Sequence, residues 1–306
     1  MTTLPRGLYT ALATPFDANG EVDFVGLKQN IEEQINAHVS GIVLIGSTGE
    51  AATLTTDEEK EMIELAVQTI DRRCTLVIGV GSSSTKTSVK KLKTAQECGA
   101  DAVLVISPYS NKPTQEGLYY HFQTLSSESD IPIVLYNHPG RTGVSIALDT
   151  IRRLLAHPNI AGIKDCSADL GYFMELCRLF KNDIQIISGD DAFAYSHLGL
   201  GASGLFSTAS NLFPHVMAKL VSLVLERRFD EALSLHYKLL PLFNALNSET
   251  NPIPLKKGME LMGKPSGSPR LPLTPLSAGN TATLEKLLSR HCTFLDKALR
   301  EEQTPA

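Results

Sequence analysis

The sequence contains no tryptophan and no long hydrophobic segment. None of its apolar runs approaches the roughly 20 residues that a membrane-spanning helix needs, so we expect no membrane partner. Residues 1–6 lack the basic region and the apolar core of a signal peptide. Lys and Arg number 28 against 33 Asp and Glu, and the net charge of -5 gives no basic surface for nucleic acid. These absences predict a cytoplasmic protein that acts on a small molecule.

Cysteine and histidine also occur without the spacings that would bind metal or form disulfides. The five cysteines are widely scattered and form no C-x-x-C pair: Cys74, Cys98, Cys166, Cys177 and Cys292. The eight histidines show no H-E-x-x-H spacing. The sequence therefore predicts reduced, mostly buried thiols and no metal site.

What the sequence does contain is a regular alternation of short apolar runs and amphipathic segments. The apolar runs predict buried strands near residues 8–13, 42–45, 76–78, 102–106, 131–136, 160–164, 184–187 and 204–206. A helical segment follows each run; in residues 24–35, for example, apolar side chains recur three and four positions apart. About eight such units with no break in composition predict one closed (β/α)₈ TIM barrel over residues 1–212. Periodic leucines then predict a C-terminal helical extension over residues 213–306.

Lys164 ends one of the predicted strands. An ammonium group at the end of a buried strand is costly unless it is paired or its pKa is lowered. A lowered pKa suits imine chemistry, because only the neutral amine attacks a carbonyl carbon. The alternative is a structural lysine paired with Asp165 or with another nearby carboxylate.

Other polar residues also fall at the predicted strand ends. In a TIM barrel the active site lies at the carboxyl ends of the strands. The side chains and glycine predicted to meet Lys164 there are Thr14, Ser47, Thr48, Tyr136 and Gly189. A tyrosine hydrogen-bonded to a hydroxyl can move the protons that imine formation requires. The alternatives are a core tyrosine with a satisfied hydroxyl and, for the Ser-Thr pair, an ordinary turn or helix cap.

Three segments resemble signatures of the dihydrodipicolinate synthase / N-acetylneuraminate lyase family of class I pyruvate aldolases. They are G-S-T-G-E at 46–50, Y-N-H-P-G-R-T at 136–142 and G-I-K-D at 162–165. Further matching segments lie at 108–117, 188–191, 251–254 and 273–275. The resemblance covers nearly the whole chain and implies the barrel fold.

The resemblance also implies roles for the strand-end residues. Lys164 would form an imine with pyruvate, and Tyr136 would shuttle protons with Ser47 or Thr48 as its hydroxyl partner. The amides of Ser47 and Thr48 would hold the pyruvate carboxylate at the start of the following helix, where free N–H groups favour an anion. No cofactor is implied beyond this covalent intermediate.

The substrate that condenses with pyruvate is implied by Arg141. In synthases that use L-aspartate 4-semialdehyde for lysine and diaminopimelate biosynthesis, an arginine at this point of the motif binds the carboxylate of the aldehyde, a task that suits a planar fork. The Gly189 backbone would lie near the imine, and Gly204 near the bound substrate. Tyr109 would lie near a dimer contact, within a homotetramer built from two dimers.

The sequence differs from the synthase pattern at three points. Ser110 stands where the synthases have a second tyrosine, Ser47 stands where many have threonine, and residues 165–167 read Asp-Cys-Ser where Glu-Ala-Thr is common. These differences leave open a paralogous, N-acetylneuraminate lyase-like enzyme that acts on another 2-oxo acid or aldehyde. A metal-dependent barrel enzyme and a non-catalytic binding barrel are alternatives from other classes.

Overall fold

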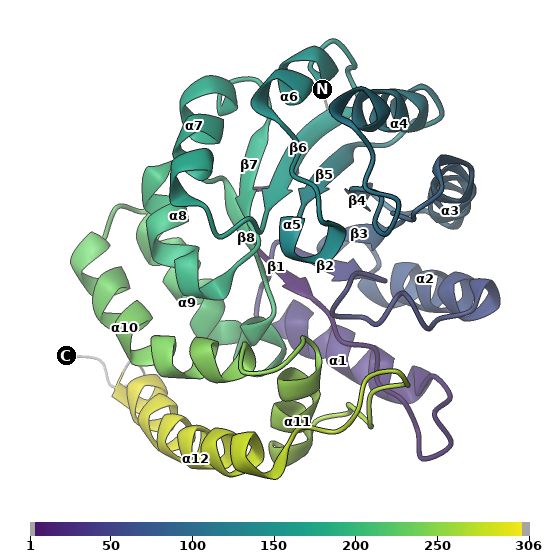
Figure 1. Cartoon of the computed structure of the whole chain (residues 1–306). Helices are drawn as coiled ribbons and strands as arrows, with labels where there is room; N and C mark the ends of the chain where they lie inside the picture. Colours follow the sequence, from purple (N-terminus) through teal and green to yellow (C-terminus); the bar gives the residue numbers. More distant parts are fainter. Residues whose placement is uncertain (1–3, 302–306) are drawn as a thin grey trace.

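The computed structural model describes the backbone of residues 4–301 and the side chains of residues 4–289. Its central feature is a closed barrel in which β1 to β8 pair in chain order and run parallel (Figure 1). The strands are β1 (Gly7–Ala11), β2 (Gly41–Leu44), β3 (Thr75–Gly79), β4 (Ala102–Ile106), β5 (Ile133–Asn137), β6 (Ile160–Asp165), β7 (Gln185–Ser188) and β8 (Gly204–Ser207). The predicted TIM barrel is confirmed, and each predicted strand is present.

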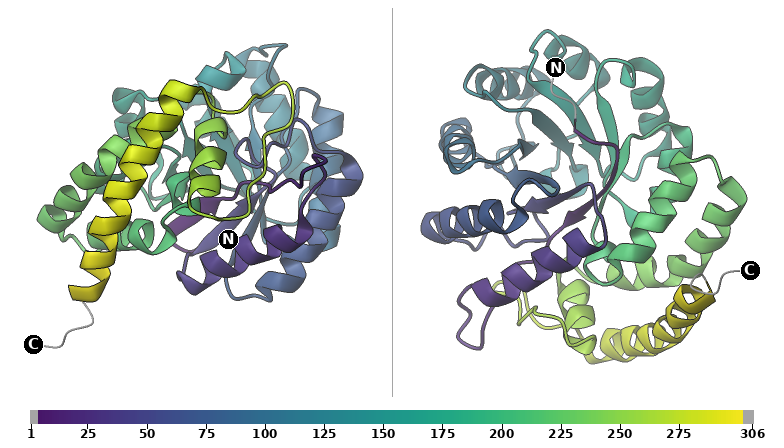
Figure 2. Two further views of the ribbon diagram at one scale, coloured as in Figure 1. Left: turned by 90° about the horizontal axis from the view of Figure 1, so that it is seen from below. Right: turned by 180° about the vertical axis from the view of Figure 1, so that it is seen from behind.

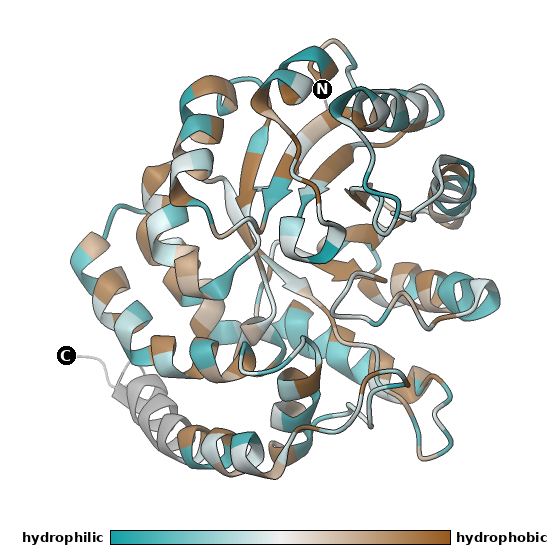
Figure 3. Cartoon of the chain, in the orientation of Figure 1, coloured by the Kyte–Doolittle hydropathy of each residue, from teal (hydrophilic) through white to brown (hydrophobic). Residues whose placement is uncertain are grey.

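The apolar strand sequences are explained by burial on both faces. Side chains such as Tyr9, Val77 and Phe206 fill the inside of the barrel, while their neighbours pack outward against the helices. In Figure 3 the strands are accordingly mostly hydrophobic, and the helices carry hydrophobic and hydrophilic stripes. The packed interior closes the barrel, so ligand access is left to its ends.

The helices of the outer layer follow their strands. They are α1 (Phe24–Asn36), α2 (Thr56–Ile70), α3 (Thr85–Cys98), α4 (Gln115–Ser127), α5 (Pro139–Thr142), α6 (Leu148–Leu154), α7 (Leu170–Phe180), α8 (Ala194–Leu200) and α9 (Pro214–Leu225), with 3₁₀ turns at Asp191–Phe193 and Ala209–Asn211. Helix α2 begins with a capping box, in which the Thr55 side chain accepts the Glu58 N–H and the Glu58 carboxylate accepts the Thr55 N–H. The next residue, Glu59, is buried, and its carboxylate binds Lys91 at 2.6 Å.

The C-terminal part of the chain is helical, as predicted. Helix α9 packs against β1 and β8, and α10 (Phe229–Leu246) packs against α8 and α9. Helices α11 (Ile253–Leu261) and α12 (Ala278–Glu301) continue from it, and Figure 2 shows α12 along the outside of the molecule beside α10 and α11. The division of the chain at residues 212 and 213 stays a prediction. Within residues 4–301, no helix has the length and apolarity to cross a bilayer.

Candidate active site

The barrel opens at the carboxyl ends of its strands into a cavity of about 700 Å³. Its lining includes most of the residues predicted from the strand ends: Ser47, Thr48, Tyr136, Arg141, Lys164 and Gly189. Tyr109 lines an adjoining cavity of about 310 Å³ that also reaches Ser47, Tyr136 and Arg141. We call this end of the barrel the mouth. Loops far apart in the sequence therefore meet at one place.

Lys164 lies on β6, one residue before the strand ends, and its residue is 6% exposed. Its Nζ atom lies 4.2 Å from the centroid of the Tyr136 ring. Asp165 is not its ion partner, because that carboxylate accepts hydrogen bonds from Asn137 Nδ2 at 2.7 Å and Ser167 Oγ at 2.8 Å. Burial lowers the pKa of Lys164 below its usual range, and the nearby Arg141 charge adds to this effect. At a given pH, a larger fraction of Lys164 is therefore in the neutral amine form than for an exposed lysine.

Tyr136 lies near the end of β5, and its side chain shares hydrogen bonds with Ser47 and Cys166. Burial raises the pKa of Tyr136 well above its ordinary value, so its hydroxyl stays protonated. The Cys166 thiol donates to the Gly189 carbonyl at 3.1 Å, and burial raises the pKa of the thiol to about 11. The phenol is thus surrounded by neutral groups that can pass a proton beside the amine.

Ser47 and Thr48 lie in a loop of turns that follows β2 and ends where α2 begins at Thr56. The expectation that they open a helix is wrong, because several turn residues come first. Within the described residues, the N–H groups of Ser47 and Thr48 donate to no acceptor. The buried Thr14 side chain donates a hydrogen bond of 2.7 Å from Oγ1 to the Gly49 carbonyl. Thr14 therefore holds the loop in place and does not line the cavity. Two free N–H groups are a suitable site for a carboxylate.

Arg141 belongs to the short helix α5, which the sequence pattern did not predict. Its Nη2 atom donates to the backbone carbonyl of Asn251 at 3.0 Å, and Asn251 Nδ2 donates to Thr48 Oγ1 at 2.9 Å. Asn251 therefore joins the arginine to the loop of free N–H groups. The arginine is exposed and lines both cavities, so it can bind an anionic group of an incoming molecule.

The two predicted glycines lie at opposite ends of the barrel. A Cβ atom on Gly189 would lie 2.5 Å from Lys164 Cε and 2.2 Å from Cys166 Sγ, so any side chain there would displace the lysine. Gly204 instead begins β8, where a Cβ atom would lie 2.5 Å from the Gly7 carbonyl oxygen. Its predicted place near the substrate is therefore wrong: the need for glycine there comes from close strand packing.

The residue of β8 that approaches the lysine is Phe206, whose ring centroid is 5.7 Å from Lys164 Nζ. Phe206 is 1% exposed and packs within the barrel. Sequence reasoning missed it because an apolar residue in an apolar strand carries no chemical signal. No group of three or more His, Cys, Asp or Glu among the described residues is arranged to hold a metal ion.

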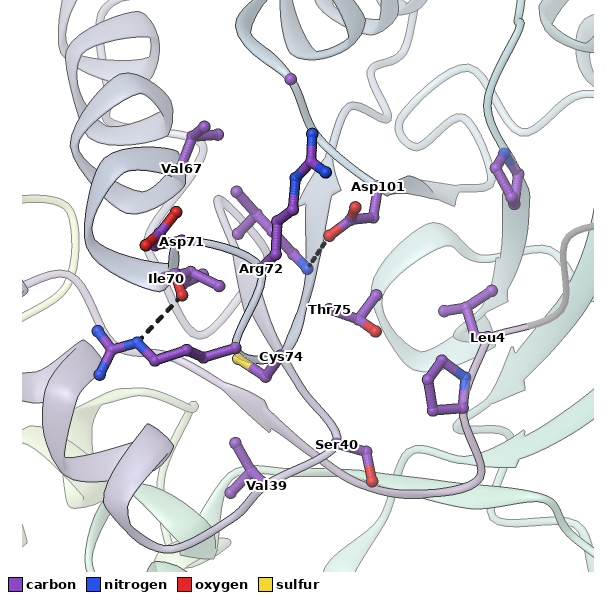
Figure 4. A pocket seen from close by; sticks show the side chains of 15 residues that line it. Leu4, Val39, Ser40, Val67, Ile70, Asp71, Arg72, Cys74, Thr75 and Asp101 are labelled. Carbon is purple, nitrogen blue, oxygen red and sulfur yellow. Dashed lines mark hydrogen bonds between the residues drawn. The ribbon is translucent and has the colours of Figure 1, made fainter.

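A second cavity, of about 870 Å³, lies at the other end of the barrel, where the strands begin (Figure 4). It is lined by Thr75, Asp101 and the turn after α2, and two of its charged side chains bind backbone groups. Asp101 Oδ2 accepts the Leu76 N–H at 2.7 Å, and Arg73 Nε donates to the Ile70 carbonyl at 3.2 Å (Figure 4). It holds no lysine beside a tyrosine.

Comparison with known proteins extends the geometric evidence. The model of the dihydrodipicolinate synthetase family matches residues 4–291. The chain is 40% identical over 287 residues to the 4-hydroxy-tetrahydrodipicolinate synthase of Protochlamydia amoebophila, covering 93% of this chain and 96% of that protein. The structure of the 4-hydroxy-tetrahydrodipicolinate synthase of Methylacidiphilum fumariolicum SolV is 40% identical and superposes with a TM-score of 0.94, covering 96% of this chain and 98% of that one.

A third relative is informative because its structure contains a ligand. The dihydrodipicolinate synthase of Acinetobacter baumannii, whose crystal structure is complexed with pyruvate, is 36% identical to this chain. The two structures superpose with a TM-score of 0.91, covering 94% of this chain and 98% of that one. With a family match over nearly the whole sequence, and with the barrel and its mouth in place, the chain belongs to the dihydrodipicolinate synthetase family.

Proposed function

We propose that this chain is a class I aldolase-type lyase that condenses pyruvate with L-aspartate 4-semialdehyde, the reaction of 4-hydroxy-tetrahydrodipicolinate synthases. The observation that carries the proposal is the buried Lys164 amine, which has no carboxylate within ion-pairing distance among the described residues and lies 4.2 Å from the Tyr136 ring centroid. Relatives named for this activity match over more than nine tenths of the chain. We also propose a place in lysine and diaminopimelate biosynthesis, in the cytoplasm.

The first half of the proposed reaction activates pyruvate. The neutral Lys164 amine attacks C2 of the keto acid, and the carbonyl oxygen takes up a proton and leaves as water from the carbinolamine. The C=N bond then acidifies the methyl group, and loss of a proton from C3 gives an enamine. Tyr136, with Ser47 as its hydrogen-bonding partner, exchanges these protons without placing a fixed charge beside the amine.

The free N–H groups of Ser47 and Thr48 are proposed to hold the pyruvate carboxylate during these steps. Gly189 leaves room for the imine, because a side chain there would collide with Lys164. Phe206 lines the barrel beside the lysine and adds to its burial. Together these contacts orient C2 of pyruvate toward Lys164.

The second half joins the enamine to the aldehyde. Arg141, at the exposed edge of the mouth (the rim), is proposed to bind the carboxylate of L-aspartate 4-semialdehyde. This contact places the aldehyde carbon toward the enamine carbon. After the new C–C bond has formed, the amino group of the acceptor replaces Lys164 at C2, closing the ring and releasing the lysine. Ser110 is exposed and too short to act as a second phenol, so we propose that Tyr136 exchanges its protons through Ser47 and Cys166.

A substrate panel tests this assignment. Purified protein is assayed with pyruvate and a set of aldehydes, including L-aspartate 4-semialdehyde and its deaminated analogue, and separately with N-acetylneuraminate in the cleavage direction. We expect the highest kcat/KM with L-aspartate 4-semialdehyde. Turnover of N-acetylneuraminate, with none of L-aspartate 4-semialdehyde, would overturn the synthase assignment while retaining the imine mechanism.

We further propose that the chain assembles as a homotetramer of two dimers, with Tyr109 near the contact within each dimer. Tyr109 lies at the rim, is 38% exposed and supplies an aromatic surface that a neighbouring subunit can cover. Light scattering during gel filtration measures the assembly directly. A monomer at catalytic concentrations would exclude the proposed assembly.

A further inference from the structure

A buried ion pair joins the C-terminal helices to the loop that carries Ser47 and Thr48. Lys256 of α11 and Glu50 of the loop have Nζ and Oε1 2.6 Å apart, and each side chain is only 1% exposed. The second carboxylate oxygen of Glu50 accepts the backbone N–H of Arg270 at 2.9 Å. Glu50 is therefore held on both oxygens by residues more than 200 positions later in the chain.

Such a pair is a poor source of stability. Both charges lose their hydration on burial, and replacing a buried ion pair with well-packed neutral side chains of similar volume is often neutral or stabilising. Burial lowers the pKa of Lys256 below its usual value, and the charge of Glu50 beside it acts in the opposite direction. The pair is better explained by the conformation that it holds than by the stability that it adds.

That conformation concerns the carboxylate-binding loop, residues 46–49. The loop lies between two non-glycine residues with left-handed backbones, Ile45 with φ 57° and Glu50 with φ 55°. Residues other than glycine persist in this region only when their surroundings hold them there. The ion pair holds the side chain of Glu50, and so supports this backbone conformation at the end of the loop.

The position of Glu50 determines the direction of the Thr48 N–H through a single peptide plane. The Glu50 N–H donates to the Ser47 carbonyl at 3.3 Å. That carbonyl belongs to the same planar peptide as the Thr48 N–H, which points in the opposite direction. Fixing Glu50 therefore fixes the direction of one of the two free N–H groups at the mouth.

Neighbouring contacts hold the pair itself in place. The Lys256 ammonium lies 4.0 Å from the centroid of the Phe16 ring, and the Arg270 guanidinium lies 4.3 Å from it. Arg270 also donates to the Thr53 carbonyl at 2.9 Å and pairs with Glu58 at the start of α2. Arg270, which follows α11, therefore also binds the chain between this loop and α2.

We propose that the Glu50–Lys256 pair positions the Ser47–Thr48 peptide to receive the carboxylate of the keto acid, which makes α11 a required part of the pyruvate site. This role rests on the proposed function. Glu50 and Lys256 are positioning residues, because they act through the loop and take no part in the bond-forming steps.

The test is the double variant Glu50→Gln/Lys256→Met, which removes both charges and keeps the shapes similar. We expect it to fold, with its kcat at saturating pyruvate within about threefold of wild type and its KM for pyruvate raised about tenfold or more. A purely structural pair would lower the melting temperature without separating KM from kcat in this way. The conservative variant Lys256→Arg keeps the charge, and we expect its KM to stay within about threefold of wild type.

The matched control is Lys257→Met/Glu260→Gln, which removes an exposed ion pair of 2.7 Å from the same helix. A wild-type KM in the Glu50/Lys256 double variant, or an equal rise in the control, would overturn the positioning role. So would a double variant that cannot fold, because the pair would then serve stability alone. If borohydride traps no pyruvate adduct on wild type, the proposed function fails and this role fails with it; a wild-type adduct with an unchanged double variant overturns only this role.

Discussion

The two ends of the barrel hold cavities of similar size but of different chemistry. The cavity at the carboxyl ends of the strands measures about 700 Å³, and the one where the strands begin about 870 Å³. At the strand starts, Asp101 binds a backbone N–H, and the ion pair of Arg73 with Glu32 is exposed by 43% and 38%. At the mouth, Lys164 is buried and shares its surroundings with a phenol and two free N–H groups.

This difference shows that volume alone does not identify a reactive site. Burial without an ion partner lowers the pKa of Lys164 and two N–H groups at the mouth stay free to bind, whereas Asp101 and Arg73 at the strand starts already bind other groups of the chain. The parallel strands explain why the second kind gathers at one end, since the loops at their carboxyl ends face a common opening. The larger cavity lacks a buried lysine beside a phenol, and the smaller one carries the proposed chemistry.

The largest effect should come from removing the amine at the mouth. Lys164→Ala deletes the group that forms the covalent bond, so we expect kcat to fall by at least about a thousandfold. Steady-state assays with pyruvate and the aldehyde measure this loss. The matched control at the other end is Arg72→Ala, which should retain full turnover. Intact turnover in Lys164→Ala would show that the covalent mechanism is wrong.

The second largest effect should come from the phenol. Tyr136→Phe keeps the ring and removes the proton-exchanging hydroxyl, so we expect kcat to fall by about 10²- to 10³-fold, the usual range for general acid–base groups. Tyr172→Phe is the control, because its hydroxyl donates to the Ile146 carbonyl at 2.6 Å and does not line the mouth. That control should lose about 1 kcal/mol of unfolding free energy and keep its kcat. Equal kcat losses in both variants would remove the special role of Tyr136.

A smaller effect, limited to one substrate, is expected at the rim. Arg141→Ala removes a charge-assisted contact to the aldehyde, and a contact of about 1.5–3 kcal/mol corresponds to a rise in KM of about 10- to 100-fold. Initial rates at saturating pyruvate give this KM, and Arg141→Lys should fall between the variant and wild type. Borohydride trapping of pyruvate alone should still give the Lys164 adduct, at a lower rate near neutral pH, because loss of the arginine charge raises the pKa of Lys164. A loss of trapping would instead place Arg141 in the pyruvate site.

The smallest effect on activity is expected at the strand starts. Asp101→Ala removes the acceptor of the Leu76 N–H, so we expect about 1 kcal/mol less unfolding free energy in urea titrations. Turnover should stay within about twofold of wild type, because the loss is structural and local to the start of β3. A tenfold loss of activity in a fully folded variant would break the distinction between the two ends.

Much of this architecture could be predicted from the sequence. The apolar runs and the helical periods between them identified the barrel, because parallel strands buried on both faces are apolar along their length. The end of a strand also identified where Lys164 and Tyr136 would meet, since the topology fixes that meeting point. These predictions needed only local patterns and the geometry of a closed parallel barrel.

Other parts of the site could not be predicted from local patterns. Gly204 was expected near the substrate, yet it begins its strand and packs against Gly7, and Phe206 of the same strand approaches the lysine instead. Asn251 lies far along the chain from Thr48, and no local pattern reveals the hydrogen bond between them. The partners of Asp165 were likewise hidden, because Asn137 comes from the neighbouring strand β5. Such contacts depend on register and on tertiary packing.

The most direct test of the central claim is borohydride reduction of the wild-type protein with pyruvate, followed by peptide mapping. The account predicts one covalent adduct per chain, located on Lys164. Because the buried amine has a lowered pKa and only its neutral form attacks, the trapping rate should rise with pH until that pKa is passed. No adduct, or an adduct on another lysine, would contradict the account.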